Sequence, residues 1–453
     1  MNQTGFSEAA LAEAIEFIDP WLRRRHESLD MPGFVVAISY MGSIAYKGAF
    51  GVSDIENGTE LSPDSVFRIG SQSKSFTAAA IMQLQEAEIL SIDELACSYV
   101  PELKTHHDAR WQMITIEQLL SHSAGVMRDG RDADFWELKR DFPDRQRLIQ
   151  DVLSADLVLD PGTQMKYSNL GYGLLGCVIE NASGKSYDEY IREGIIEPLG
   201  LMNTGTDYLP STDTDIAIGY GRRGSEKKRS AFANITARSL SPATGFYSTA
   251  EDVCTYFNSL LLKNANTVLL SEESKRAMQQ TRWPVKNSQN VEYGLGIDIG
   301  YVNDRRIIGH GGGYLGHLTN TFVDVEDEVI ITAMTNCIDG DALSITLGVT
   351  EALQYFRPRP VAKDSDLRRF NSCVDGLWST RQILVSGDRI VSFEPNTWHP
   401  FVDCEELAYV DESTLVVKKA NGFDSEGEHV RFTFDDQDLV QAVNYCGRSM
   451  LPE

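Results

Sequence analysis

Strand patterns occur at both ends of residues 30–356, and helical patterns fill most of the stretch between them. Near the start, 34–40 and 44–50 are two β-rich runs separated by Met41-Gly42-Ser43, which indicates a hairpin. The later strand patterns cover 294–301, 305–309, 317–325 and 328–335, and the helical patterns cover 7–29, 75–90, 115–121, 145–154, 170–182, 186–194, 250–262 and 341–356. This order predicts an α+β fold, with one antiparallel sheet built from both ends, flanked by helices and carrying an inserted helical subdomain.

The character of the chain changes after Arg357-Pro358-Arg359-Pro360, which breaks the helical pattern and marks a linker. From about residue 366, short β-rich runs alternate with turn residues, as is typical of a small β-barrel or sandwich. These runs cover 377–379, 382–385, 389–393, 407–409, 414–418, 430–434 and 439–443. We therefore expect a first domain over 1–360, with its helical subdomain at about 75–285, and an all-β domain over 361–453.

A serine and a lysine stand three residues apart in Gly70-Ser71-Gln72-Ser73-Lys74, just before an apolar run that reaches Leu84. At this spacing the two side chains share one face of a helix. The run is apolar almost all round, so the helix should be buried, and burial lowers the pKa of a lysine from about 10.4. A hydroxyl beside such an amine predicts a covalent acyl-transfer site. A second copy of the spacing, Ser225 to Lys228, lies in a polar stretch and is interpreted as a solvated loop.

A phenol and an amide, Tyr167 and Asn169, stand between the turn Asp160-Pro161-Gly162 and a helical pattern. A phenol near a lysine can relay protons in acyl transfer. The same Tyr-x-Asn spacing occurs at Tyr256, in an amphipathic helical pattern, and at Tyr301, beside a hairpin turn. Those two tyrosines are interpreted as structural.

A histidine followed by three glycines, His310-Gly311-Gly312-Gly313, ends the predicted strand 305–309. Glycines here allow a substrate to approach the backbone and leave N–H groups free to donate. Gly311, Gly313 and Gly316 also match the spacing of a dinucleotide fingerprint, but that motif requires a helix to follow and a strand pattern follows instead. The structural alternative, a histidine at a glycine-rich turn, stays open.

Taken in order, Ser71-x-x-Lys74, Tyr167-x-Asn169 and His310-x-Gly312 resemble the three motifs of the serine β-lactamase and penicillin-binding-protein superfamily. The match is to the class C-like branch, which contains esterases, D-aminopeptidases and related peptidases. The resemblance covers roughly residues 30–355 and implies a sheet flanked by helices with a helical subdomain. The all-β region resembles the lipocalin-like C-terminal modules of some peptidases in this branch.

Carried over to this chain, the resemblance implies a role for each motif residue. Ser71 would be the acylated nucleophile, and Lys74 the amine that activates it. Tyr167 would relay protons to the leaving group and to the deacylating water, and Asn169 would line the pocket and orient Lys74 or a substrate amide. The backbone N–H groups of Ser71 and Gly313 would form the oxyanion hole.

The third motif departs from the Lys-Thr-Gly pattern of class A β-lactamases. Here His310 stands where those enzymes have a lysine, and Gly312 completes the motif in the substrate-binding strand. Histidine is mostly neutral at pH 7, whereas lysine is a permanent cation. We therefore expect His310 to complete the catalytic set while weakening the binding of substrates that carry a carboxylate.

Composition restricts the partners. The formal net charge is −25 and the pI is about 4.7, which argues against nucleic acid and anionic membranes. Seven cysteines without a Cys-x-x-Cys pair fit reduced thiols in a cytoplasm, and residues 1–8 predict no secretory signal. No metal spacing is found, and no organic cofactor is implied. The expected partner is a small-molecule or peptide substrate, and a homo-oligomer is an open alternative.

Together these observations predict a cytoplasmic serine hydrolase that acts on amides or esters through an acyl-enzyme. A small-peptide peptidase or amidase is favoured over an esterase because of the attached β domain. Two alternatives of the same fold are a carboxylesterase and an acyltransferase that uses a non-water acceptor. A third, in a different class, is a non-catalytic binding or sensor protein whose β domain holds a lipophilic ligand.

Overall fold

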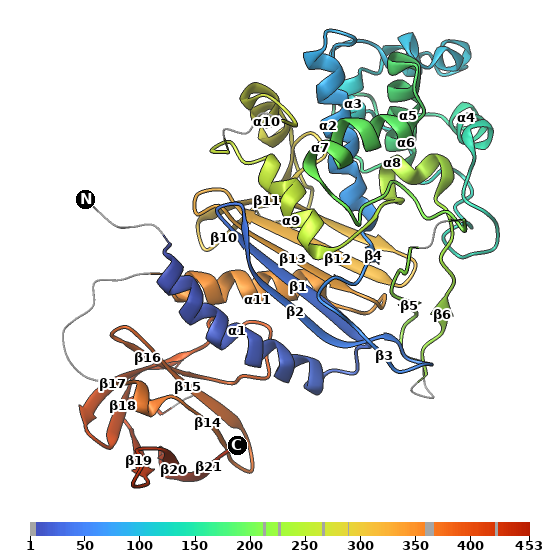
Figure 1. Ribbon diagram of the computed structural model, residues 1–453. Coiled ribbons are helices and arrows are strands. Elements are labelled where there is room, and N and C mark those ends of the chain that lie inside the picture. The colour runs from blue at the N-terminus through green and yellow to red at the C-terminus, as the bar shows by residue number, and fades with distance from the viewer. Residues whose placement is uncertain are drawn as a thin grey trace. The chain divides into compact units, whose positions relative to one another are not determined.

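The computed structural model describes residues 6–211, 214–224, 228–264, 268–288, 290–357, 367–421 and 425–453 (Figure 1). Contacts divide the chain into two compact units, Met31–Thr346 and the combination of Met1–Asp30 with Leu347–Glu453. The domain boundary predicted at residue 360 lies outside the described residues, so that division of the chain stays a prediction.

The unit Met31–Thr346 is built around an antiparallel sheet, which has nine strands within the described residues (Figure 1). The strands, in spatial order, are β3 (Thr59–Glu60), β2 (Ser43–Asp54), β1 (Gly33–Tyr40), β13 (Val329–Thr335), β12 (His317–Asp324), β11 (Arg305–Tyr314), β10 (Asp298–Val302), β9 (Glu292–Tyr293) and β8 (Trp283–Pro284). β1 pairs with β13 in a register that runs from Phe34 opposite Thr335 to Tyr40 opposite Val329. The two ends of the unit therefore meet in one sheet, which confirms the predicted α+β architecture.

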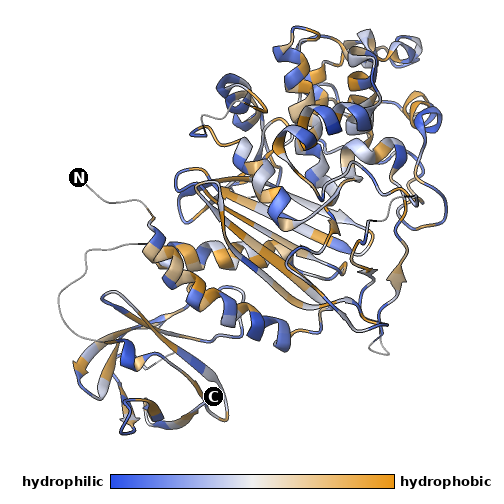
Figure 2. Cartoon of the chain, viewed as in Figure 1, coloured by the Kyte–Doolittle hydropathy of each residue, from blue (hydrophilic) through white to orange (hydrophobic). Residues whose placement is uncertain are grey.

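The centre of the sheet is apolar because its strands are covered. Every residue of β13 is buried, as is all of β1 except Tyr40. Figure 2 shows the hydrophobic residues concentrated along these central strands. One cover is α9 (Ala250–Ser259), which packs against β1 and β13. Burial of this kind is the main favourable term in folding the unit.

A helical layer follows β4 (Phe67–Arg68), which pairs with β7 (Tyr247–Ser248). Its helices are α2 (Ser73–Glu86), α3 (Ile116–Leu120), α4 (Arg145–Leu153), α5 (Asn169–Ser183), α6 (Tyr187–Ile191), α7 (Glu197–Leu199), α8 (Ser241–Thr244) and α10 (Glu272–Gln279). α2, α5 and α8 pack against one another. At the start of α5 the Ser168 hydroxyl accepts a hydrogen bond from Gly171 N (2.9 Å), and Gly184 ends the helix in the left-handed conformation. These caps explain why the helix begins directly at the predicted Tyr-x-Asn motif.

The sequence placed the end of one strand too early. β11 continues through the glycines to Tyr314 instead of ending at Gly309. Glycine has low intrinsic strand preference, but here the absence of side chains lets β11 lie against the preceding single-turn helix η1 (Gly70–Gln72). A Cβ atom on Gly312 would come within 1.9 Å of Ile69 O.

The second unit contains a closed antiparallel barrel, as the short strand patterns predict. Its strands are β14 (Ser372–Asp375), β15 (Thr380–Ser386), β16 (Arg389–Phe393), β17 (Glu405–Asp411), β18 (Thr414–Lys419), β19 (His429–Phe434), β20 (Val440–Tyr445) and β21 (Arg448–Pro452). The strand predicted at 377–379 is wrong, because this segment is the turn between β14 and β15. Gly376 N donates to Ser379 O (3.0 Å), and the apolar side chains of Leu377 and Trp378 are 92% and 86% exposed.

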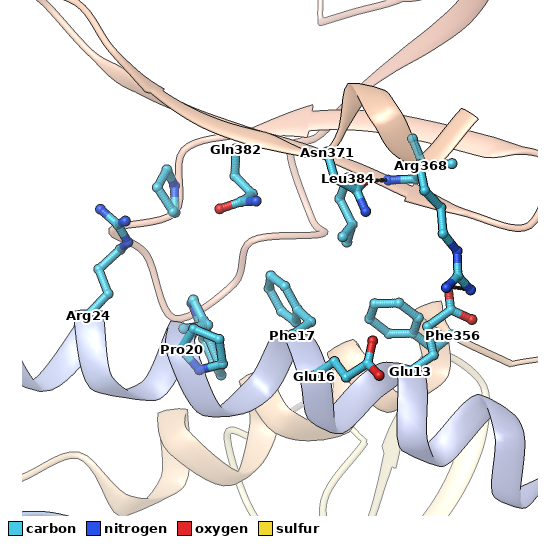
Figure 3. Close-up of a pocket in the computed structure, with 13 residues that line it drawn as sticks. Glu13, Glu16, Phe17, Pro20, Arg24, Phe356, Arg368, Asn371, Gln382 and Leu384 are labelled. Atoms are coloured by element: carbon cyan, nitrogen blue, oxygen red, sulfur yellow. Dashed lines mark hydrogen bonds and ion pairs between the residues drawn. The ribbon is translucent and has the colours of Figure 1, made fainter. Parts of the chain in front are cut away.

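The same unit contains α1 (Glu8–Ser28), which the amphipathic pattern predicts. A groove of about 270 Å³ separates α1 from the barrel (Figure 3). Phe17 and Pro20 of α1 face Gln382 and Leu384 of β15 across it. Two further helical elements of the chain are α11 (Ala342–Tyr355) and η7 (Leu367–Phe370). Among the described helices, none has the length and apolar composition needed to cross a bilayer.

Candidate active site

The Ser-x-x-Lys motif lies where the sheet meets the helical layer. Ser71 belongs to η1, and Lys74 is in the first turn of α2. Gly70, just before the serine, has φ +55°, and a Cβ there would lie 2.5 Å from Gly313 N. Only glycine satisfies both the left-handed backbone and this close approach. The result is a partly exposed Ser71 hydroxyl 3.1 Å from Lys74 Nζ.

The Lys74 amine is fully buried and has three polar neighbours. Its Nζ donates to Asn169 Oδ1 (2.8 Å) and to the backbone oxygen of Ala243 (2.7 Å), and the Ser71 hydroxyl is the third. Burial lowers the pKa of Lys74 well below its usual range, although the nearby Asp129 carboxylate acts in the opposite direction. A neutral amine has two N–H bonds and one lone pair. In the neutral form, the two carbonyl acceptors would take both N–H bonds and the lone pair would face the Ser71 hydroxyl.

Tyr167 lies over this pair. Lys74 Nζ is 4.7 Å from the centre of the Tyr167 ring, and the Arg128 guanidinium is 5.3 Å from it. Burial raises the pKa of Tyr167 above its usual range, and the neighbouring Ser71 hydroxyl opposes this only in part. The phenol therefore keeps its proton at neutral pH. The structure thus brings together four predicted residues, Ser71, Lys74, Tyr167 and Asn169.

The third predicted motif lies on β11. His310 is 3% exposed; its Nε2 lies 3.1 Å from the Tyr293 hydroxyl, and its Nδ1 lies 2.6 Å from Gly311 O. Because a carbonyl oxygen can only accept, Nδ1 carries a proton. Burial also lowers the pKa of His310. Gly312 lies against the η1 backbone, and the next residue, Gly313, lies beside Gly70.

A second buried histidine supports the Tyr167 segment. His122 stacks near Tyr167, Tyr172 and Tyr293, with ring centres 4.2, 5.0 and 4.9 Å away. Its Nδ1 accepts from the backbone N–H of Ser168 (3.2 Å). Burial lowers the pKa of His122 well below its usual range, so the ring is neutral. His122 thus holds the Tyr-x-Asn segment in place without adding charge.

The site opens into a pocket of about 550 Å³. Ser71, Asn169 and Gly313 line it, which places three predicted residues at one surface. Its other lining residues are Arg128, Asp129, Trp136, Glu137, Leu138, Phe232, Tyr314, Leu315, His317, Leu318 and Ile338. The lining includes the aromatic residues Trp136, Phe232 and Tyr314, and the Asp129 carboxylate accepts from the Asn169 amide.

Sequence reasoning missed several groups that contact the predicted residues. They include Asp129, Tyr293 and the backbone oxygen of Ala243, besides His122 and Arg128 at Tyr167. A carbonyl oxygen has no sequence signature, and Tyr293 lies in a two-residue strand. Asp129 follows Gly125 by four residues in a stretch without periodicity, so nothing in the pattern marked it.

The chain was compared with known protein families. A family model described as Beta-lactamase matches residues 18–350. Among curated proteins, Protein flp of Staphylococcus aureus (strain COL) is 29% identical over 198 residues, covering 43% of this chain and 39% of that protein. Beta-lactamase-like protein 2 of Dictyostelium discoideum is 26% identical over 301 residues, covering 65% of this chain and 54% of that protein. The matches therefore span less than two thirds of the length of these relatives.

Solved structures were compared with the whole chain. The octameric penicillin-binding protein homologue from Pyrococcus abyssi has a TM-score of 0.66 at 22% identity and covers 97% of this chain and 99% of its own. The D-stereospecific amidohydrolase from Streptomyces sp. has a TM-score of 0.61 at 22% identity, with 79% of this chain and 100% of its own covered. The structure of SurE has a TM-score of 0.64 at 20% identity, with 98% and 100% covered. At these identities the comparison establishes a common fold.

Proposed function

The chain belongs to the beta-lactamase family, and on that premise we propose that it is a serine hydrolase that cleaves amide or ester bonds through an acyl-enzyme on Ser71. The observation that carries the proposal is the environment of Lys74. Its amine is fully buried and lies 3.1 Å from Ser71 Oγ, 2.8 Å from Asn169 Oδ1 and 2.7 Å from the backbone oxygen of Ala243. An amine held this way is a base directed at one hydroxyl.

The proposed reaction begins when Lys74 Nζ takes the Ser71 proton and Oγ attacks the substrate carbonyl carbon. The carbonyl oxygen becomes an oxyanion, and the N–H groups of Ser71 and Gly313 would stabilise it; one such donor is worth about 10²–10³ in rate. Tyr167 then gives its proton to the departing nitrogen or oxygen and regains one from the Lys74 ammonium. Deacylation runs these steps in reverse with water in place of the leaving group. Water attacks the acyl carbon as its proton passes through Tyr167 to Lys74, the bond from that carbon to Ser71 Oγ breaks, and Oγ regains its proton from Lys74.

Small peptides and amides are the proposed substrates. The pocket of about 550 Å³ fits a small substrate, and its apolar wall of Trp136, Phe232 and Tyr314 would hold an apolar group. The preference for amides is supported by the fold shared with a D-stereospecific amidohydrolase. His310, neutral and buried, remains the residue proposed to limit the use of carboxylate-bearing substrates. Cleavage of esters or transfer to an amine or alcohol would use the same acyl-enzyme.

Two further predictions belong to this proposal. A cytoplasmic location is supported by the seven cysteines without disulfide or zinc spacing. Assembly into a homo-oligomer is supported by the fold shared with an octameric homologue. Gel filtration with light scattering would measure the second directly, and a monomer at micromolar concentration would contradict it.

A fluorophosphonate probe tests the nucleophile, because it reacts covalently only with activated serines. We expect labelling of the wild type at Ser71, no labelling of Ser71→Ala and normal labelling of Ser98→Ala, an exposed serine far along the chain. A panel of D- and L-aminoacyl anilides and short-chain esters then assigns the substrate class. A folded wild-type protein that resists the probe and the whole panel would instead favour the non-catalytic binding or sensor alternative.

A further inference from the structure

A carboxylate that belongs to none of the three motifs contacts the site from the pocket side. Asp129 Oδ1 accepts from Asn169 Nδ2 (2.7 Å) and from the Trp136 indole N–H (3.0 Å). Its second oxygen lies 3.3 Å from Arg128 Nε, and the Asp129 side chain is only 12% exposed. A partly buried carboxylate with three donors is held in one place, and it can hold its partners in return.

The first consequence is the orientation of the Asn169 amide. An asparagine side chain has one oxygen that accepts and one NH₂ group that donates. With Nδ2 on Asp129, Oδ1 faces Lys74 Nζ at 2.8 Å. Turning the amide over would place oxygen against the Asp129 carboxylate and NH₂ against the Lys74 amine. Both contacts would then be repulsive or lost, so the carboxylate determines which end of the amide faces the lysine.

The second consequence reaches the nucleophile. Asn169 Oδ1 is one of the two acceptors that engage the N–H bonds of Lys74 and leave its lone pair for Ser71. We propose that Asp129 is a positioning residue for acylation, because it fixes the Asn169 amide and, through that amide, directs the Lys74 amine at the Ser71 hydroxyl. This inference rests on the proposed serine hydrolase function and deepens it.

The Trp136 contact extends the same arrangement to the pocket wall. Its indole N–H donates to the oxygen that also holds Asn169, and Trp136, Asp129 and Asn169 all line the pocket. A substrate that packs on the Trp136 indole would therefore lie beside the Asp129 carboxylate that orients the Asn169 amide. Trp136→Phe keeps an aromatic ring but removes this donor, so it should impair acylation less than loss of the carboxylate.

Because Asp129 is charged, its proposed role can also be tested through the pH dependence of labelling, besides the labelling rate. Burial is the largest influence on Lys74 and lowers its pKa; the Asp129 carboxylate raises that pKa, the Arg128 guanidinium lowers it, and the Asp298 carboxylate raises it. Removing the charge should lower the pKa of Lys74 further, so the amine would lose its proton at a lower pH. The acid limb of the pH–rate profile should then move to lower pH, even as the maximal rate falls.

The test compares Asp129→Asn with Asp134→Asn, a substitution of an exposed acid in the same loop whose ion pair to Lys139 is at the surface. We expect fluorophosphonate labelling of Asp129→Asn to be about 10- to 100-fold slower, which is the range for losing a hydrogen bond to a charged group. The acid limb of its pH–rate profile should lie at lower pH than that of the wild type. Asp134→Asn should match the wild type in both. Equal rates and equal pH profiles for the two variants would overturn the proposal.

Two further measurements distinguish a loss of positioning from misfolding and from a lack of activity. Asp129→Ala leaves a gap beside the pocket, and added formate should restore part of its labelling rate if a carboxylate is what the site lacks; no recovery in a folded variant would count against the proposal. NMR titration of ¹⁵N-labelled lysine reads the pKa of Lys74 without turnover. If the wild type resists the probe, the proposed function fails, whereas an active wild type with an equally fast Asp129→Asn variant refutes the positioning role alone.

Discussion

Replacing Gly312 by alanine adds one methyl group where β11 lies against the Ser71 turn. The new Cβ would be 1.9 Å from Ile69 O and 2.7 Å from Thr319 Oγ1, whereas ordinary contact begins at 3.4 Å. One of the two backbones must therefore move by about 1.5 Å. Gly312 is outside the left-handed region, so alanine adopts its backbone conformation without strain and the effect is steric alone.

The displaced segment carries the N–H of Gly313, the proposed second donor of the oxyanion hole. A misplacement of about 1 Å can cost about 10²-fold in rate, so Gly312→Ala should lower the rate of acylation by about 100-fold or more. Overpacking of this kind costs about 1–3 kcal/mol in free energy of unfolding. The variant should therefore stay folded, with a Tm lower by several degrees.

The assay is the rate of fluorophosphonate labelling at Ser71, measured beside thermal unfolding. Gly311→Ala is the matched control on the same strand. The nearest atom to its new Cβ would be Asn320 Oδ1, at 3.2 Å. That contact requires a shift of a few tenths of an ångström, so labelling should stay within about threefold of the wild type. Wild-type labelling of Gly312→Ala would show that the contact between β11 and η1 does not set the geometry of acylation.

Three further predictions follow from other parts of the structure. Wild-type labelling should rise with pH as Lys74 loses its proton, with a midpoint below the usual value of about 10.4, and a flat profile between about pH 5 and 10 would exclude an amine base. Arg68→Met should cost about 3–5 kcal/mol in chemical denaturation, because it leaves the Asp207 carboxylate without its buried partner at 3.0 Å; adding Asp207→Asn should recover much of the loss. Trp378→Ser should change stability by less than about 0.5 kcal/mol, because the indole is 86% exposed, and a larger loss would mean that another surface covers it.

Much of the fold was predictable because its elements have strong local patterns. The hairpin of β1 and β2 and the late strands are β-branched runs bounded by turns, and α2 is apolar almost all round up to Leu84. The motif residues converge because each follows or begins such an element: Lys74 starts α2 and Asn169 starts α5. The wrong strand prediction at 377–379 also came from a local pattern. The run 377–379 has strand-like residues, but a turn between two paired strands places them in solvent.

The parts of the site that the sequence did not predict depend on tertiary contacts. Asp129 and Tyr293 come from segments without helical or strand periodicity, and their role depends on which atoms the fold places opposite them. The sequence identified His310 as a neutral replacement for a lysine. It contained no sign that the ring would be buried beside the Tyr293 hydroxyl.

Burial disfavours the charged form of four groups around Ser71. Burial lowers the pKa of His122, His310 and Lys74, and it raises the pKa of Tyr167. New charge would then appear only when Ser71 attacks, as an oxyanion and a Lys74 ammonium. An effective base needs a pKa near the working pH, and burial moves the pKa of Lys74 downward. The Asp129 carboxylate, one amide away from Lys74, offsets that penalty without contacting the amine, which is why its removal should change the pH profile as well as the rate.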